Sequence, residues 1–150
     1  MLFKRYVLFF ILIFSTKVYS DDIPVIVINA SKKPQSLSTV GTSVTILDEK
    51  FFNNTGEYFL GDALGTTTTS ANFFQSGGHG TSSAIQLRGM PKRYSTVYID
   101  GVKMSDPSSV SNDFDFNNIL TSQVAKVEIL KGNQSSVYGS GAIGGTIHIT

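Results

Sequence analysis

Residues 124–150 read Val-Ala-Lys-Val-Glu-Ile-Leu-Lys-Gly-Asn-Gln-Ser-Ser-Val-Tyr-Gly-Ser-Gly-Ala-Ile-Gly-Gly-Thr-Ile-His-Ile-Thr, two apolar runs joined by a connection rich in Gly and Ser. The first run, 124–130, places Val127 and Ile129 on one face of an extended chain, and the second, 146–150, alternates between polar and β-branched residues. Alternation with period two is typical of strands that are buried on one side. The stretch therefore predicts two strands linked by a glycine-rich loop.

Further strands are predicted over 42–47, 83–87 and 96–99, where β-branched residues again alternate with polar ones. A helix is predicted over 55–64, begun by Thr55 as a cap and ended by Gly65. Several short strands with one or two short helices predict an α+β domain with a small mixed β-sheet and long loops. We expect 83–88 and 96–100 to form a hairpin through the turn around Pro91, which would bring loops 74–82 and 101–113 to the same end.

Composition excludes several classes of function. The 150 residues hold 12 Lys and Arg, 11 Asp and Glu, two His and no Cys. Near-neutral charge is untypical of proteins that bind the phosphate backbone, so no nucleic-acid partner is expected. His79 and His148 lie far apart without neighbouring ligands, so we expect neither a metal site nor a cofactor. No nucleophile and base occur in a recognisable pattern, which predicts a protein that is not an enzyme.

The first twenty residues predict a signal peptide. Lys4 and Arg5 precede an apolar run over 6–14, and Ser20 supplies a small residue at a cleavage point. The run is shorter than the roughly 20 residues that span a bilayer, so a membrane anchor is the weaker interpretation. Of the 130 residues from position 21 onward, 52 are Ser, Thr, Asn or Gly. This composition predicts a domain whose surroundings are polar on most sides.

An apolar, β-branched run follows the predicted cleavage site. It is either an edge strand of the domain, which Pro24 permits, or an extended segment that pairs with another protein's sheet edge. The polar stretch behind it and its terminal position favour the second interpretation. The run consists of Ile23, Pro24, Val25, Ile26, Val27 and Ile28.

Three motifs suggest a family. Leu87-Arg88-Gly89, then Ile99-Asp100-Gly101-Val102, then 127–132 leading into 136–145 resemble, in order and spacing, the plug domain of TonB-dependent outer-membrane receptors. The resemblance covers 23–150, and within the family 75–83 and 137–140 are most similar to the vitamin B12 (cobalamin) transporters. Siderophore and haem receptors share all the same motifs and remain an alternative.

The resemblance implies a plug that sits inside a 22-stranded β-barrel of the cell outer membrane and gates energy-coupled uptake of a scarce ligand. Its partners would be the barrel, the ligand and TonB, which would bind residues 23–28 from the periplasm. The implied division is a signal peptide over 1–20, the TonB box and linker over 21–35, and the plug over 36–150. Because such a barrel is far longer than this chain, we expect a fragment; a free periplasmic interaction module is the rival.

Two groups of residues are candidates for binding. Loops 74–82 and 101–113 combine glycines with hydrogen-bonding groups, and in a plug they would face the ligand. The candidate ligand-binding residues are Gln75, Gly77, Gly78, His79, Ser82, Ser105 and Asp106. By resemblance, Arg88 and Lys131 would contact barrel carboxylates. Lys131 stands where the family usually has Arg, so a two-pronged contact would be weaker here.

Overall fold

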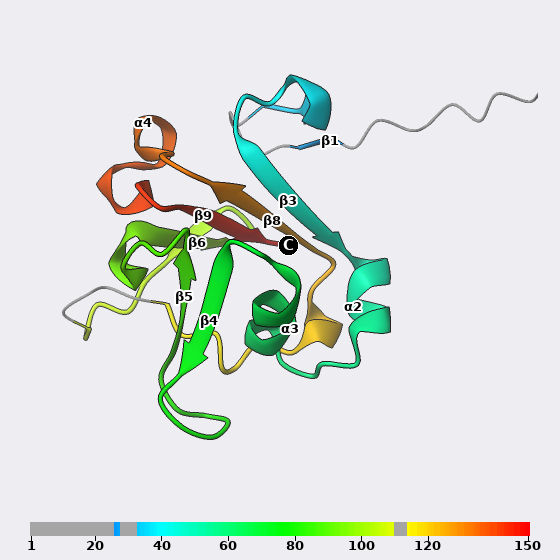
Figure 1. The fold of residues 1–150 in the computed structure, drawn as a ribbon, viewed down its shortest axis with the longest axis vertical. Coiled ribbons are helices and arrows are strands. Elements are labelled where there is room, and N and C mark those ends of the chain that lie inside the picture. Colours follow the sequence, from blue (N-terminus) through cyan, green and yellow to red (C-terminus); the bar gives the residue numbers. More distant parts are fainter. Residues whose placement is uncertain (1–25, 28–32, 110–113) are drawn as a thin grey trace, which may run out of the picture.

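The computed structural model describes residues 26–27, 33–109 and 114–150 (Figure 1). The predicted signal peptide, and the predicted TonB-binding residues other than Ile26 and Val27, lie outside this part. In chain order the elements are β1 (Ile26–Val27), β2 (Gln35–Ser36), η1 (Leu37–Thr39), β3 (Ser43–Asp48), α2 (Glu49–Thr55), α3 (Leu60–Thr67), β4 (Ala71–Gln75), β5 (Ser83–Leu87), η2 (Lys92–Tyr94), β6 (Ser95–Ile99), β7 (Val102–Met104), η3 (Thr121–Gln123), β8 (Lys126–Lys131), α4 (Ser135–Tyr138), η4 (Ser140–Ala142) and β9 (Gly145–Ile149).

A five-stranded sheet forms the centre of the domain, in the order β3-β8-β9-β6-β7. Its neighbours are antiparallel except β6 and β9, which run parallel, so the sheet is mixed. The two strands predicted over 124–130 and 146–150 correspond to β8 and β9, which pair directly, with Ile129 opposite Ile147. This arrangement confirms the predicted α+β domain with a small mixed sheet.

One face of the sheet carries the hydrophobic core. Val127, Ile129 and Ile147 are fully buried and pack with Leu60 and Leu64 of α3. Alternation along β8 and β9 sends these side chains to the same face, and each contributes roughly 1.5–3 kcal/mol by leaving water. The remaining buried members include residues of the β4–β5 hairpin, so α3 and that hairpin cover the face.

The helical region differs from its prediction. Thr55 is the last residue of α2, which the sequence analysis missed, and Gly56 ends α2 in a left-handed conformation at φ 71°. Asp48 caps α2 by accepting a hydrogen bond from Phe51 N. The second helix, α3, begins at Leu60 and continues through Gly65, whose missing side chain leaves room for Phe73.

The predicted hairpin between 83–88 and 96–100 is wrong. β5 instead pairs with β4 in a separate two-stranded antiparallel sheet, with Phe73 opposite Ile85. β6 pairs with β9 and β7. The segment 71–75 was missed because its two adjacent phenylalanines break the alternation on which strand prediction rests.

The amino-terminal strand pair lies far from the β4–β5 loop. Ile26 pairs with Ser36 and Val27 with Gln35 in antiparallel register. Figure 1 shows this pair near the upper end of the long axis and loop 76–82 at the lower end. Ile26 and Val27, the described residues of the candidate TonB-binding segment, therefore lie near the end of the domain opposite the candidate ligand loop.

Candidate functional site

Loop 76–82 connects the antiparallel strands β4 and β5 and is closed by its own hydrogen bonds. Ser76 N donates to Ser82 O at 3.0 Å, where the strands end. Within the loop, Gly78 O accepts from Thr81 N at 3.2 Å, from Thr81 Oγ1 at 2.9 Å and from Gln75 Nε2. Gly80 has φ +87°, a conformation that side-chain-bearing residues rarely adopt. These bonds give the loop a defined shape.

The five candidate ligand-binding residues at this hairpin are therefore brought together. Gly77, Gly78, His79 and Ser82 are exposed, whereas Gln75 is partly buried at the end of β4. Because Gln75 donates one of its two amide hydrogens to Gly78, its carbonyl oxygen and its second amide hydrogen are left for an outside partner. Backbone groups, the Ser82 hydroxyl and the Gln75 amide can therefore be presented to a polar ligand at this end of the hairpin.

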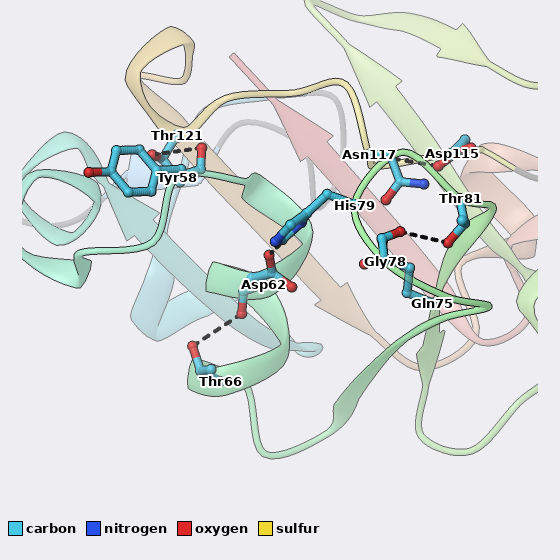
Figure 2. A network of polar contacts seen from close by, with 10 residues as sticks. All are labelled: Tyr58, Asp62, Thr66, Gln75, Gly78, His79, Thr81, Asp115, Asn117 and Thr121. Atoms are coloured by element: carbon cyan, nitrogen blue, oxygen red, sulfur yellow. Dashed lines mark hydrogen bonds and ion pairs between the residues drawn. The ribbon is translucent and has the colours of Figure 1, made fainter.

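His79 reaches from the loop onto the start of α3 (Figure 2). Its ring stacks on Phe59, with centroids 4.7 Å apart and planes inclined by 24°. Its Nδ1 atom lies 3.9 Å from Oδ2 of Asp62 in the first turn of the helix. Sequence reasoning missed Phe59 and Asp62, because their place under the loop depends on the β4–β5 pairing that it did not predict.

The base of the loop is tied to the segment that follows the second candidate loop. Ser83 Oγ donates to Asp115 Oδ1 at 2.6 Å, and Phe116 N donates to Ser83 Oγ at 3.0 Å. Asn117 N also donates to Asp115 Oδ1, at 3.1 Å. The side-chain nitrogen of Asn117 is buried without a hydrogen-bond partner. These residues were missed as well, and no local sequence pattern marks them.

Ser105 and Asp106 lie in a turn of their own. Asp106 Oδ1 accepts from Ser108 N at 2.8 Å and from Ser108 Oγ at 2.6 Å. These bonds lower the pKa of the exposed Asp106 carboxyl, the side-chain bond contributing most. The hydrogen bonds therefore stabilise the turn itself. Ser105 and Asp106 were expected beside loop 76–82 because of a β5–β6 hairpin, which does not form. Hydrogen bonds of Ser83 instead link the base of that loop to Asp115 and Phe116.

Arg88 and Lys131 come together at the other end of the hairpin. Nη1 of Arg88 lies so close to Gly132 that a Cβ there would be 3.0 Å from it. Burial lowers the pKa of Lys131, and the positive charge of Arg88 lowers it further. In the ranges 33–109 and 114–150, no carboxylate lies within ion-pair distance of either cation. Arg88 also has a left-handed φ of 53°, unusual for a residue with a side chain.

An open pocket of about 570 Å³ borders Arg88. Hydroxyl groups dominate its wall, and one of them, Oγ1 of the buried Thr68, has no hydrogen-bond partner. The pocket can hold water or a polar group beside Arg88. Its lining consists of Gly65, Thr66, Thr67, Thr68, Thr69, Ser70, Ala71, Asn72, Gln86, Arg88 and Gly89.

The sheet face opposite the core carries a buried polar cluster. His148 stacks on Tyr98, with ring centroids 4.8 Å apart, and contacts the tilted ring of Tyr138 at 5.0 Å. Burial lowers the pKa of His148 to about 4, although the neighbouring Glu128 opposes this change. Glu128 is itself buried and accepts a 2.7 Å hydrogen bond from Lys126 Nζ. Burial raises the pKa of Tyr138 to about 12. A neutral imidazole is therefore the form that this environment favours.

The described residues form neither a metal-binding cluster nor a membrane-spanning helix. No three His, Asp or Glu side chains among them converge in a way that could hold a metal ion. None of the helices in that part combines the length and the apolar character needed to cross a membrane.

Comparisons with known proteins agree on one family. The profile of the family described as TonB-dependent Receptor Plug Domain matches residues 36–146. The vitamin B12 transporter BtuB of Vibrio vulnificus (strain CMCP6) is 30% identical over 124 residues, which cover 83% of this chain and 20% of the transporter. The chain thus spans about a fifth of the length of this curated relative.

Solved receptor structures share the fold. The ferric yersiniabactin uptake receptor FyuA of Yersinia pestis is 28% identical, with a TM-score of 0.52 over 72% of this chain and 16% of the receptor. The siderophore receptor PiuA of Acinetobacter baumannii has a TM-score of 0.60 over 85% of this chain and 16% of its own, at 24% identity. At that identity the second likeness concerns the fold alone.

Proposed function

Because the chain belongs to the family of TonB-dependent receptor plug domains, we propose that it closes the barrel of an outer-membrane importer and gates energy-coupled ligand uptake. The signal peptide predicted over 1–20 directs export, and the domain sits in the barrel lumen with its amino terminus toward the periplasm. No reaction is catalysed: the work done on the ligand is transport.

The arrangement of Arg88 and Lys131 is the observation that carries this proposal. Two like charges lie side by side, and no described carboxylate compensates them. Such a pair is destabilising on its own and becomes favourable when an anion approaches from outside. Carboxylates on an enclosing wall would supply that anion and hold the domain in place. The neighbouring pocket of hydroxyl groups supports a polar surrounding of the same kind.

The ligand that we propose is cobalamin. The 30% identity with a vitamin B12 transporter supports this choice, and so does the similarity of 75–83 and 137–140 to such transporters. Loop 76–82, with Gln75, would form part of the floor on which the ligand rests. Ser105 and Asp106 would extend that floor from the second loop.

A siderophore is the second candidate. The 28% identity with the ferric yersiniabactin uptake receptor favours it. Both ligands are large and rich in hydrogen-bonding groups, so the polar loop suits either.

The energy would enter through residues 23–28. The backbone of Ile26 and Val27 already adopts a strand and pairs with Gln35 and Ser36. An extended segment of this kind can add to the sheet of TonB, and a pull on it would act on the plug through the chain. Ligand binding must favour the state in which the segment is available, because coupling requires a difference in free energy between two states.

Uptake by whole cells tests the proposal. The full-length protein is produced in the outer membrane of cells that lack their own receptors, and uptake of cyanocobalamin and of ferric yersiniabactin is measured with and without TonB. We expect TonB-dependent uptake of cyanocobalamin. TonB-dependent uptake of the siderophore alone would support the second candidate, and uptake of neither would refute both choices of ligand.

A further inference from the structure

Loop 76–82 is anchored to α3 through one side chain. Among the hydrogen bonds, ion pairs and ring contacts of the described residues, those of His79 alone link the loop to an element other than the two strands that carry it. The other such interactions close the loop on itself or tie it to Gln75 at the end of β4. The loop contains Gly77, Gly78 and Gly80, which gain much conformational freedom when a loop is released. A single anchor therefore has a large influence on where the loop lies.

The ring stack, rather than the charge contact, provides the anchor. Nδ1 of His79 and Oδ2 of Asp62 are 3.9 Å apart, beyond hydrogen-bond distance. The His79 side chain is 68% exposed, and exposed ion pairs contribute little. The stack on Phe59 has the near-parallel geometry and 4.7 Å separation of a favourable aromatic contact.

Phe59 is a fixed platform for this stack. It forms an isolated β-bridge with Leu120, and the next residue, Leu60, donates its backbone N–H to Ile119 O at 2.9 Å. Leu60 is fully buried in the core. The backbone contacts of Phe59 and of Leu60, the first residue of α3, therefore fix the ring under His79. Through His79, the glycine-rich loop 76–82 docks on this fixed ring.

We propose that His79 is a positioning residue that docks loop 76–82 on α3, and that it tunes ligand affinity through the loop's position rather than by touching the ligand. This inference rests on the proposed function only where it concerns the ligand. It changes the role of His79 from the direct contact that the sequence suggested. It also gives Phe59, which no motif marked, the role of the ring on which His79 docks.

The experiment compares substitutions that separate stacking from hydrogen bonding in the full-length receptor. His79→Phe keeps a ring and loses the polar atoms, whereas His79→Gln keeps polar atoms and loses the ring. His79→Ala removes both, and Phe59→Leu removes the platform ring with little change of volume. Asp62→Asn is the control for the charge contact. Amide hydrogen exchange of residues 76–82 is measured without ligand, and cyanocobalamin and ferric yersiniabactin affinity is then measured by equilibrium binding.

We expect exchange in the loop to rise about two- to tenfold in His79→Ala, His79→Gln and Phe59→Leu, as the strength of an aromatic pair implies. The double variant His79→Ala with Phe59→Leu should exchange no faster than either single variant, since both remove one contact. His79→Phe and Asp62→Asn should exchange as the unsubstituted protein does. Affinity for the bound probe should change in the same variants and be restored by His79→Phe.

Two results would overturn the proposal. Unchanged loop exchange in His79→Ala would show that the stack does not hold the loop. Affinity restored by His79→Gln but not by His79→Phe would show that His79 touches the ligand. If the unsubstituted receptor binds neither probe, the proposed function fails in its choice of ligand, while the exchange data, which need no ligand, still decide whether His79 docks the loop.

Discussion

Ser83 and Asp115, 32 positions apart in sequence, are joined by a 2.6 Å hydrogen bond from Ser83 Oγ to Asp115 Oδ1. The same hydroxyl accepts from Phe116 N, so one buried side chain ties the base of loop 76–82 to the segment 114–117. This link to residues that follow the second candidate loop exists although β5 and β6 do not pair with each other.

Replacing Ser83 by Ala should destabilise the domain by about 1–3 kcal/mol, because Phe116 N–H then stays buried without a partner. Urea unfolding of the domain measures the change. Ser82→Ala, at the exposed neighbouring position, is the control and should stay within about 0.5 kcal/mol. Equal stability of the two variants would mean that the Ser83 hydroxyl does not hold the segment.

Stability should fall as the pH drops from about 6.5 to 4. The pKa of His148 is lowered to about 4 in the fold, whereas the unfolded chain binds the proton near the ordinary value of 6.5. Between these values the unfolded state carries more protons, so the free energy of unfolding decreases with falling pH, by at most about 3 kcal/mol. Above about pH 6.5 this residue contributes no pH dependence.

His148→Phe separates this effect from the titration of carboxyl groups. The phenyl ring can stack on Tyr98 and contact Tyr138 but cannot bind a proton. The difference in unfolding free energy between pH 7 and pH 5 should be smaller in this variant than in the unsubstituted domain, as urea titrations at the two pH values would show. The same difference in both proteins would exclude His148 as its source.

The sequence predicted four of the five strands of the central sheet because their β-branched residues alternate, as Val127, Ile129 and Ile147 do. The fifth strand, β7, lies within the segment that was expected to be loop 101–113. The pairing of the strands could not be predicted in the same way. No local sequence pattern distinguishes pairing of β5 with β4 from pairing with β6, because the choice depends on which faces the core covers. The helix α2 was missed because its cap, Asp48, ends a strand directly before it.

The candidate site was predicted unevenly for the same reason. Glycines and hydroxyl groups marked loop 76–82, and motifs marked Arg88 and Lys131. Sequence patterns could not predict the contacts that these residues make with other elements. The stack of His79 on Phe59, for example, joins two elements whose relative position only the tertiary fold determines.

Arg88→Gln should have opposite effects in two settings. In the domain alone it removes the repulsion with Lys131, so the free energy of unfolding should stay constant or rise by less than about 1 kcal/mol. In the full-length receptor it would remove the proposed contact with a barrel carboxylate, and amide exchange of the plug should become faster. Lys131→Arg, which adds a two-pronged donor, should slow that exchange.

Exchange in the full-length receptor that is the same for Arg88→Gln and for the unsubstituted protein would contradict the proposed contact between Arg88 and a barrel carboxylate. Lys92→Gln, in the short helix η2, is a matched control for loss of one positive charge.

The most direct test of the central claim replaces Ile26 by Pro in the full-length receptor. Proline has no backbone N–H and cannot complete a strand pairing with TonB at this position. Ile26→Val keeps the N–H and is the control. Cells are assayed for surface binding and for TonB-dependent uptake of cyanocobalamin. The account predicts that Ile26→Pro abolishes uptake but leaves binding intact, with Ile26→Val normal in both; undiminished uptake by Ile26→Pro would contradict it.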